Sequence, residues 1–205
     1  MVILFFVTAK NRDIHSGENS DIDIVDKVLQ GDREAFRVIV ERYQSYLYRT
    51  AFAFLGSPED AEDSLQEIFI KVYRYLGTFK LGNRFRPWIY TIALNHLRKQ
   101  YKKKKNIIQF TPAEPEFLES LPDNSAGTNP LSVFEKKEIR ASVNKAISNL
   151  KGNLKEVVIL YYINEMSVEE VAQTLKLGKE NVKSRLFRAR KILKNILKKD
   201  KTELQ

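Results

Sequence analysis

The sequence contains no cysteine and only two histidines, His15 and His96, among its 205 residues. Without thiols there are no disulfides and no thiolate zinc sites, and two histidines argue against a histidine-rich metal site. Eight glycines and six prolines are too few for a fibrous or low-complexity chain. We therefore expect a globular protein of a reducing compartment, the cytoplasm, that carries no metal or other cofactor.

Long hydrophobic runs are also missing. The most apolar stretch, residues 1–7, is too short to span a bilayer and has neither a basic region nor a small-residue cleavage site. We interpret residues 1–20 as a frayed or locally packed N-terminal extension. A truncated signal or an upstream misassigned start is the alternative interpretation.

Positive charge is what the sequence has in excess. It contains 35 Lys and Arg against 26 Asp and Glu, a formal net charge of +9. This excess favours a polyanionic partner, either nucleic acid or an anionic membrane surface. The length allows two cores of under about 100 residues each, or one larger core with tails.

From residue 21 onward, apolar residues recur at helical spacing and no strand-like alternation persists, which predicts an all-α fold. Asp32 and Ser57 stand at helix N-caps, Pro58 at a first helical position, and Gly31 and Gly56 at helix ends. The expected helices cover residues 22–30, 33–55, 58–76, 87–104, 131–149, 154–164, 168–175 and 179–197.

A change in composition divides the chain. Residues 106–130 contain four prolines and four acidic residues but no Lys or Arg, which is typical of a flexible linker. The sequence thus predicts two small helical domains, residues 21–105 and 131–200, joined by this linker.

The second domain carries the pattern of a helix-turn-helix. Ser167 and Glu170 form a capping box before a short helix, a tight turn at residues 176–178 follows, and a longer basic helix begins at Lys179. Arg and Asn on such a helix can contact guanine and adenine in the major groove. The alternative is an amphipathic surface helix with a solvated basic face. The residues expected to contact duplex DNA are Lys179, Asn181, Lys183, Ser184, Arg185, Phe187, Arg188 and Arg190.

The first domain contains an acidic helix start at residues 59–67 and an aromatic and basic stretch at residues 78–105. Clustered carboxylates can bind Mg²⁺, but acidic residues in a first helical turn also stabilise the helix dipole without a metal. Rings interleaved with cations suit unpaired bases and a phosphate backbone, although Trp88 and Tyr90 could equally belong to the core.

Three segments together resemble the extracytoplasmic-function (ECF) sigma factors of bacterial RNA polymerase. They are DAEDSLQEIF at residues 60–69, FRPWIYTIA at residues 85–93 followed by Asn95, and VKSRLFRAR at residues 182–190. The resemblance covers residues 22–198 in the family's order, with a linker in the expected place. It implies a non-enzymatic promoter-specificity subunit that joins core RNA polymerase, opens the promoter and then dissociates.

The resemblance also implies partners and site residues. Asp60, Asp63, Gln66 and Glu67 would contact core RNA polymerase, at the clamp of the β′ subunit, and the β subunit is a further expected partner. Promoter DNA is the second partner, an anti-sigma factor is the expected regulator, and no small-molecule substrate is implied. The basic helix from Lys179 would bind the minus-thirty-five element. The melted minus-ten element would be captured by Phe79, Arg84, Phe85, Arg86, Trp88, Asn95 and Arg98.

Two features depart from the family pattern. Lys99 stands where many members carry an acidic residue, and the apolar N-terminal segment has no assigned counterpart. A stand-alone helix-turn-helix regulator is the competing interpretation. An enzyme is the third class, but the sequence lacks a phosphate-binding P-loop, a nucleophile elbow and a thiol nucleophile.

Overall fold

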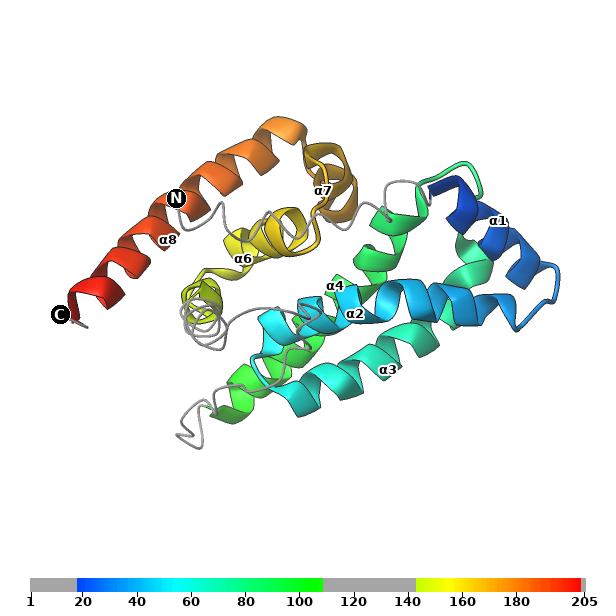
Figure 1. Cartoon of the computed structure of the whole chain (residues 1–205), viewed down its shortest axis with the longest axis horizontal. Coiled ribbons are helices and arrows are strands. Elements are labelled where there is room, and N and C mark those ends of the chain that lie inside the picture. Colours follow the sequence, from blue (N-terminus) through cyan, green and yellow to red (C-terminus); the bar gives the residue numbers. More distant parts are fainter. Residues whose placement is uncertain (1–17, 109–142, 204–205) are drawn as a thin grey trace, which may run out of the picture.

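The structure, a computed structural model, describes residues 18–108 and 143–203, and the side chains of residues 21–104 and 143–197 (Figure 1). Within these ranges every regular element is helical, which confirms the expected all-α fold. The expectations for residues 1–17 of the N-terminal extension, for the linker beyond residue 108 and for a helix over residues 131–142 lie outside the described residues.

Four α-helices form the first half of the chain: α1 (Glu18–Leu29), α2 (Ala35–Leu55), α3 (Pro58–Tyr75) and α4 (Phe85–Ile108). A short 3₁₀ turn, η2 (Leu76–Thr78), follows α3. The central helix α2 packs against α1, α3 and α4 and supplies much of their common core. Figure 1 shows α1 at the far end of this bundle, beside the start of α4.

The helix ends in this half follow the caps in the sequence. The Asp32 carboxylate accepts a hydrogen bond from the backbone N–H of Ala35 at 3.2 Å, and Gly56 ends α2 with a φ of 75°. The Ser57 hydroxyl accepts from the N–H of Asp60 at the start of α3. Several boundaries differ from expectation. Helix α1 begins at Glu18 rather than at residue 22, and α2 begins at Ala35 rather than at residue 33. Helix α4 begins at Phe85, two residues early, and ends at Ile108, so residues 106–108 belong to this helix and not to the predicted linker. Pro87 thus lies in the first turn of α4, where a missing N–H costs no helical hydrogen bond.

The second half contains a helical stretch at residues 143–148, then α6 (Gly152–Val158), α7 (Val168–Leu175) and α8 (Lys179–Glu203). The sequence predicts one α-helix over residues 154–164. Instead, α6 passes into a π-helical turn, η3 (Ile159–Ile163), and the N–H of Asn164 reaches back to the carbonyl of Ile159 at 3.0 Å. Both α6 and α7 pack against α8, which runs six residues beyond its predicted end at residue 197.

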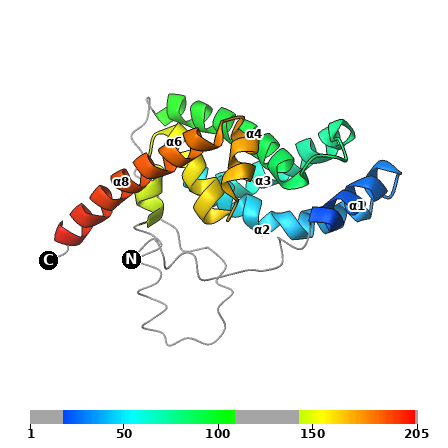
Figure 2. The same cartoon turned by 90° about the horizontal axis from the view of Figure 1, so that it is seen from above.

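The two halves lie against each other. Contacts join α4 to α7 and α2 to η3, and Figure 2 shows the two halves side by side. The buried apolar side chains of both halves form one continuous cluster. The C-terminal end of α8 extends away from the other helices (Figure 1). In the described ranges, 18–108 and 143–203, no helix is both long and apolar enough to cross a membrane.

Candidate nucleic-acid and polymerase-binding surfaces

One face of α8 presents the side chains that the sequence predicts for duplex DNA. Val182, Leu186, Ala189 and Leu193 form the buried stripe of this helix. Phe187 stands on the other side and is 66% exposed. The remaining predicted contacts are also on the surface: Lys179, Asn181, Lys183, Ser184, Arg188 and Arg190 are exposed, and Arg185 is half-buried.

Neighbouring side chains hold several of these cations along the helix. Arg185 Nε donates to Asn181 Oδ1 at 3.0 Å, and Lys183 Nζ lies 2.7 Å from Glu180 Oε1. The Glu180 carboxylate raises the pKa of Lys183 through that hydrogen bond. Exposed pairs of this kind contribute about 0–1 kcal/mol, so a DNA phosphate can replace the carboxylate at little cost.

The turn between α7 and α8 sets the position of this face. Ser167 and Glu170 make both hydrogen bonds of the predicted capping box, at 3.1 Å and 2.7 Å. Within the predicted turn at residues 176–178, the residue with a positive φ, 54°, is Lys176. An ion pair of 2.7 Å between Lys179 and Glu169 then joins the two helices and lowers the pKa of Glu169. The arrangement is that of a helix-turn-helix.

A second surface lies on α3. Asp63, Gln66 and Glu67 are exposed there as predicted, whereas Asp60 is half-buried and pairs with Lys104. Glu67 is 2.9 Å from Lys71, which lowers the pKa of that carboxyl. Large apolar side chains further along the same helix are also exposed, Ile70 at 51% and Tyr73 at 45%. Carboxylates beside exposed apolar groups suit a protein partner. In the part of the chain that the structure describes, no group of acidic residues and histidines is arranged to hold a metal ion.

An open groove of about 810 Å³ runs between α3 and α4. Trp88 and Asn95, both predicted for the minus-ten element, line it. Three cations, Lys71, Lys99 and Lys103, face the same space against one carboxylate, that of Glu67. The remaining lining residues are Tyr75, Thr78, Ile92, His96 and Gln100. A groove with two rings, several amides and a positive charge can hold an unpaired base with its phosphate.

His96 forms part of the floor of this groove and is 7% exposed. Lys71 Nζ lies 3.1 Å from its Nδ1, and since an ammonium only donates, Nδ1 is the acceptor. Burial, followed by the Lys71 charge, lowers the pKa of His96. The ring is therefore neutral near pH 7, and the positive charge in the groove comes from its lysines.

Two other residues predicted for the minus-ten element lie beneath the groove. Phe79 and Phe85 are 5% and 1% exposed, and their ring centroids stand 5.4 Å apart in a T-shaped contact. Each also packs against Trp88, at centroid distances of 5.4 Å and 5.5 Å. Buried rings cannot stack on bases in this arrangement, so their effect is to hold Trp88 in position. Tyr90, for which the sequence left a base contact and a place in the core equally open, belongs to the core and is 1% exposed.

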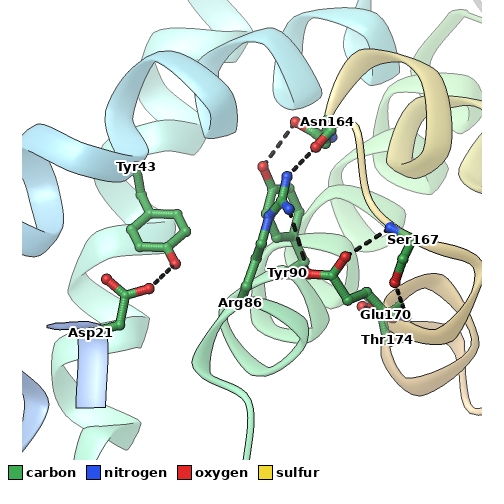
Figure 3. A network of polar contacts seen from close by, with 8 residues as sticks. All are labelled: Asp21, Tyr43, Arg86, Tyr90, Asn164, Ser167, Glu170 and Thr174. Atoms are coloured by element: carbon green, nitrogen blue, oxygen red, sulfur yellow. Dashed lines mark hydrogen bonds and ion pairs between the residues drawn. The ribbon is translucent and has the colours of Figure 1, made fainter. Parts of the chain in front are cut away.

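The predicted arginines separate into two groups. Arg84 is exposed just before α4. Arg86 and Arg98 instead point to the second half of the chain. Arg86 is paired with Glu170 and donates to the backbone carbonyl of Asn164, as Figure 3 shows. Arg98 makes two hydrogen bonds to Glu156, of 2.6 Å and 2.8 Å, and its pKa is raised mainly by them.

Sequence reasoning missed several residues at these surfaces. Lys71 and Tyr75 line the groove, and the signal for them was their helical spacing on α3. Asn164, Glu156 and Lys155 meet the first half of the chain. No signal in the sequence pointed to these three, because only the packing of the two halves brings them into contact with it.

Comparisons with known proteins cover both halves. The family model described as Sigma-70 region 2 matches residues 39–107, and the one described as Sigma-70, region 4 matches residues 140–193. The ECF RNA polymerase sigma factor SigW of Bacillus subtilis is 30% identical over 178 residues, which cover 85% of this chain and 95% of SigW. The ECF RNA polymerase sigma-E factor of Escherichia coli is 31% identical over 184 residues, which cover 88% and 95% of the two chains.

Two solved structures are similar in fold. The sigma factor RpoE in complex with the anti-sigma factor NepR, from Bartonella quintana, is 25% identical with a TM-score of 0.60, and the match covers 80% of this chain and 96% of that one. CnrH in complex with the cytosolic domain of CnrY is 24% identical with a TM-score of 0.67, over 88% and 99% of the two chains.

Proposed function

Since the chain belongs to the ECF family of RNA polymerase sigma factors, we propose that its two halves divide promoter recognition between them. As an ECF sigma factor it initiates transcription at specific promoters, and it is a polymerase subunit without enzymatic activity of its own. Residues 21–105 would bind polymerase and the minus-ten element, and residues 131–200 the minus-thirty-five element, with residues 106–130 as the linker. Family membership sets aside both the stand-alone regulator and the enzyme.

In this proposal, the groove between α3 and α4 captures the melted minus-ten strand. An extruded base would stack on Trp88, with Asn95 as its hydrogen-bonding partner, and the three lysines of the groove would hold the backbone. Extruding a base costs a few kcal/mol of stacking, so the protein must offset that cost with contacts of this kind. Lys99 adds positive charge to the groove lining, which favours a phosphate contact at that position.

The exposed face of α8 would enter the major groove at the minus-thirty-five element. Arg188 and Arg185 would make bidentate contacts to guanine, and Phe187 would contact the methyl group of thymine. Lys179 and Lys183 lie nearer the start of the helix and would neutralise phosphates. Phosphate contacts position the helix, whereas the contacts to base edges determine which sequence it prefers.

The acidic side of α3 is the proposed polymerase-binding surface. Core RNA polymerase is the partner of sigma factors, and the clamp of the β′ subunit is the finer assignment that we propose for Asp60, Asp63, Gln66 and Glu67, with the β subunit as a second contact. Exposure of Asp63, Gln66 and Glu67 on one side of the helix supports it. The exposed Ile70 and Tyr73 would extend the same contact with apolar area. Transcription initiation of this kind places the protein in the cytoplasm.

An anti-sigma factor is the proposed regulator. RpoE of Bartonella quintana, which this chain resembles in fold at 25% identity, was solved with the anti-sigma factor NepR. A partner that bridges the two halves of this chain would cover both the groove and the face of α8. Such a partner would compete with polymerase and DNA at once.

The observation that carries the division of labour is the match of two different sigma-70 regions, in order, to the two helical halves of one chain. Asp63→Lys tests its polymerase arm, and it is a cleaner change than one at Glu67, which already pairs with Lys71. We expect loss of binding to bacterial core RNA polymerase with the helical content unchanged. Glu41→Lys is the matched control, because Glu41 is exposed on α2 and its loss changes the net charge equally. Equal binding by the Asp63→Lys and control variants would contradict the assignment.

A further inference from the structure

Two of the cations predicted to bind the minus-ten element are held by the second half of the chain. We propose that the free protein occupies a self-inhibited closed state, in which the Glu156 and Glu170 carboxylates take the place of nucleic-acid phosphate at Arg98 and Arg86. The proposal rests on the minus-ten function proposed above. It adds that the chain's own second half, without any partner, takes two arginines of that surface out of use.

The contact of Arg98 with Glu156 has the geometry of a phosphate clamp. Arg98 Nε lies 2.6 Å from one carboxylate oxygen of Glu156, and Arg98 Nη2 lies 2.8 Å from the other. This parallel, two-bonded arrangement is the one that a guanidinium forms with a carboxylate or a phosphate alike. Arg98 also donates to Asn95 Oδ1 at 3.1 Å, which ties a groove residue to the same contact. DNA must therefore displace Glu156 before it can use Arg98.

The contact of Arg86 with Glu170 is enclosed. The two side chains are only 4% and 5% exposed, with 3.4 Å between Nη1 and Oε1. A phosphate cannot reach Arg86 while the halves are closed. The other oxygen of Glu170 accepts from the N–H of Ser167 in the capping box of α7, so one carboxylate joins the helix-turn-helix to α4 (Figure 3).

Further hydrogen bonds complete the closed interface. Asn164, at the end of η3, is fully buried and bonds to Thr50 and Tyr90 of the first half. The Thr91 hydroxyl lies 3.2 Å from the backbone carbonyl of Thr174. Lys155 Nζ donates to the carbonyl of Phe54, at the last turn of α2, at 3.0 Å. The second half thus contacts the first through specific polar groups spread over α2 and α4.

The same interface is built to open. Arg86 Nε has no hydrogen-bond partner among the described residues, and burial lowers the pKa of Lys155 to about 8, so two cations are held at an unfavourable desolvation cost. Buried ion pairs give little net stability, because both charges lose their hydration. On opening, these polar groups regain water, and the apolar cluster that the two halves share is divided between them. Polar contacts between domains are typical of interfaces that separate and reform.

Glu156→Gln tests the proposal, because it weakens the clamp and leaves the capping box of α7 intact. The matched control is Glu41→Gln, which removes the same charge from the exposed Arg37–Glu41 pair on α2. Since the chain has no cysteine, Gln44→Cys on α2 and Lys191→Cys on α8, both at exposed positions, take a donor and an acceptor dye without other changes. Thr91→Val, which removes the bond to Thr174, is a second opening variant that keeps the test sound if Glu156→Gln loses helical content.

Two measurements on the full-length chain test the proposed closed state. Energy transfer between the dyes reports closure. Anisotropy of a labelled, mixed-sequence single strand of about 20 nucleotides, which is longer than one binding module needs, reports binding at the minus-ten surface and its released arginines. We expect Glu156→Gln to lower energy transfer and to tighten strand binding about fivefold relative to Glu41→Gln, which corresponds to about 1 kcal/mol. Unchanged energy transfer, or lower transfer without tighter binding, overturns the proposal. If no variant binds the strand, the minus-ten assignment fails instead, and the energy-transfer result alone decides whether the chain closes.

Discussion

The hydrogen bond between Tyr90 and Asn164 offers the sharpest energetic test of how the two halves meet. Tyr90 is 1% exposed and Asn164 is fully buried, and the Tyr90 hydroxyl donates to Asn164 Oδ1 at 2.8 Å. Asn164 also donates from Nδ2 to Thr50 Oγ1 at 2.8 Å. The perturbation is a double-mutant cycle of Tyr90→Phe and Asn164→Ala.

The structure sets the expected magnitudes. Tyr90→Phe removes one buried hydrogen bond but leaves Asn164 Oδ1 with its Thr50 partner, so the free energy of unfolding should fall by about 1 kcal/mol. Asn164→Ala leaves the Tyr90 hydroxyl buried without Asn164, and the orphaned donor together with the lost packing should cost about 2–3 kcal/mol. In the double variant the hydroxyl is absent, so the combined loss should be about 1 kcal/mol smaller than the sum.

Urea denaturation followed by circular dichroism measures the cycle, with the slope of the transition required to stay constant across the four proteins. Tyr90→Phe combined with Ser148→Ala, an exposed site in the second half, is the control pair and should be additive. Additivity within about 0.3 kcal/mol for Tyr90 and Asn164 as well would refute the reasoning, because the two groups would then not meet in solution.

Three further predictions concern the separate surfaces. Arg188→Ala should cost about 1–3 kcal/mol of binding free energy at one base pair of the minus-thirty-five element, measured by duplex binding over a set of single-base variants. An equal loss on every sequence would make Arg188 a phosphate contact. Trp88→Ala should lower the fraction of promoter opened by the polymerase holoenzyme, measured by permanganate reactivity of unpaired thymines, with duplex binding by α8 unchanged; retained opening would contradict the stacking role. Burial lowers the pKa of Lys155 in the folded protein to about 8 from its ordinary 10.5, so the unfolded chain binds more protons between these values. The free energy of unfolding should therefore rise with pH, by about 1 kcal/mol from pH 7 to pH 9 relative to the Lys155→Met variant. Parallel pH profiles of the two proteins would show that Lys155 is not buried in solution.

Local signals in the sequence predicted most of the secondary structure. Ser57 and Ser167 act as helix caps where the pattern placed them, because a capping hydrogen bond spans only three residues and needs no tertiary context. Asp32 accepts a hydrogen bond from the N–H of Ala35, but the N-cap of α2 is Glu34. The buried stripe of α8 likewise follows from helical spacing alone. The π-helical turn after α6 was not predictable in this way, since an α-helix and a π-turn share the same apolar pattern at this length.

The candidate site was predictable only where its residues are neighbours along one helix. The exposed faces of α3 and α8 follow from that rule. The lining of the groove requires two helices to meet. The burial of Arg86 requires the two halves of the chain to meet, because its hydrogen bond to Asn164 joins residues 78 positions apart in the sequence. A charged residue in a basic, aromatic stretch gives no local sign that a distant glutamate will pair with it.

The central claim is that this chain directs core RNA polymerase to specific promoters, and run-off transcription with purified components tests it most directly. The purified protein, mixed with bacterial core RNA polymerase and a library of its host's promoter fragments, should form a stable complex and start transcripts at discrete sites, and Asp63→Lys should abolish both. A protein that binds duplex DNA through α8 but neither joins polymerase nor yields discrete starts would contradict the account.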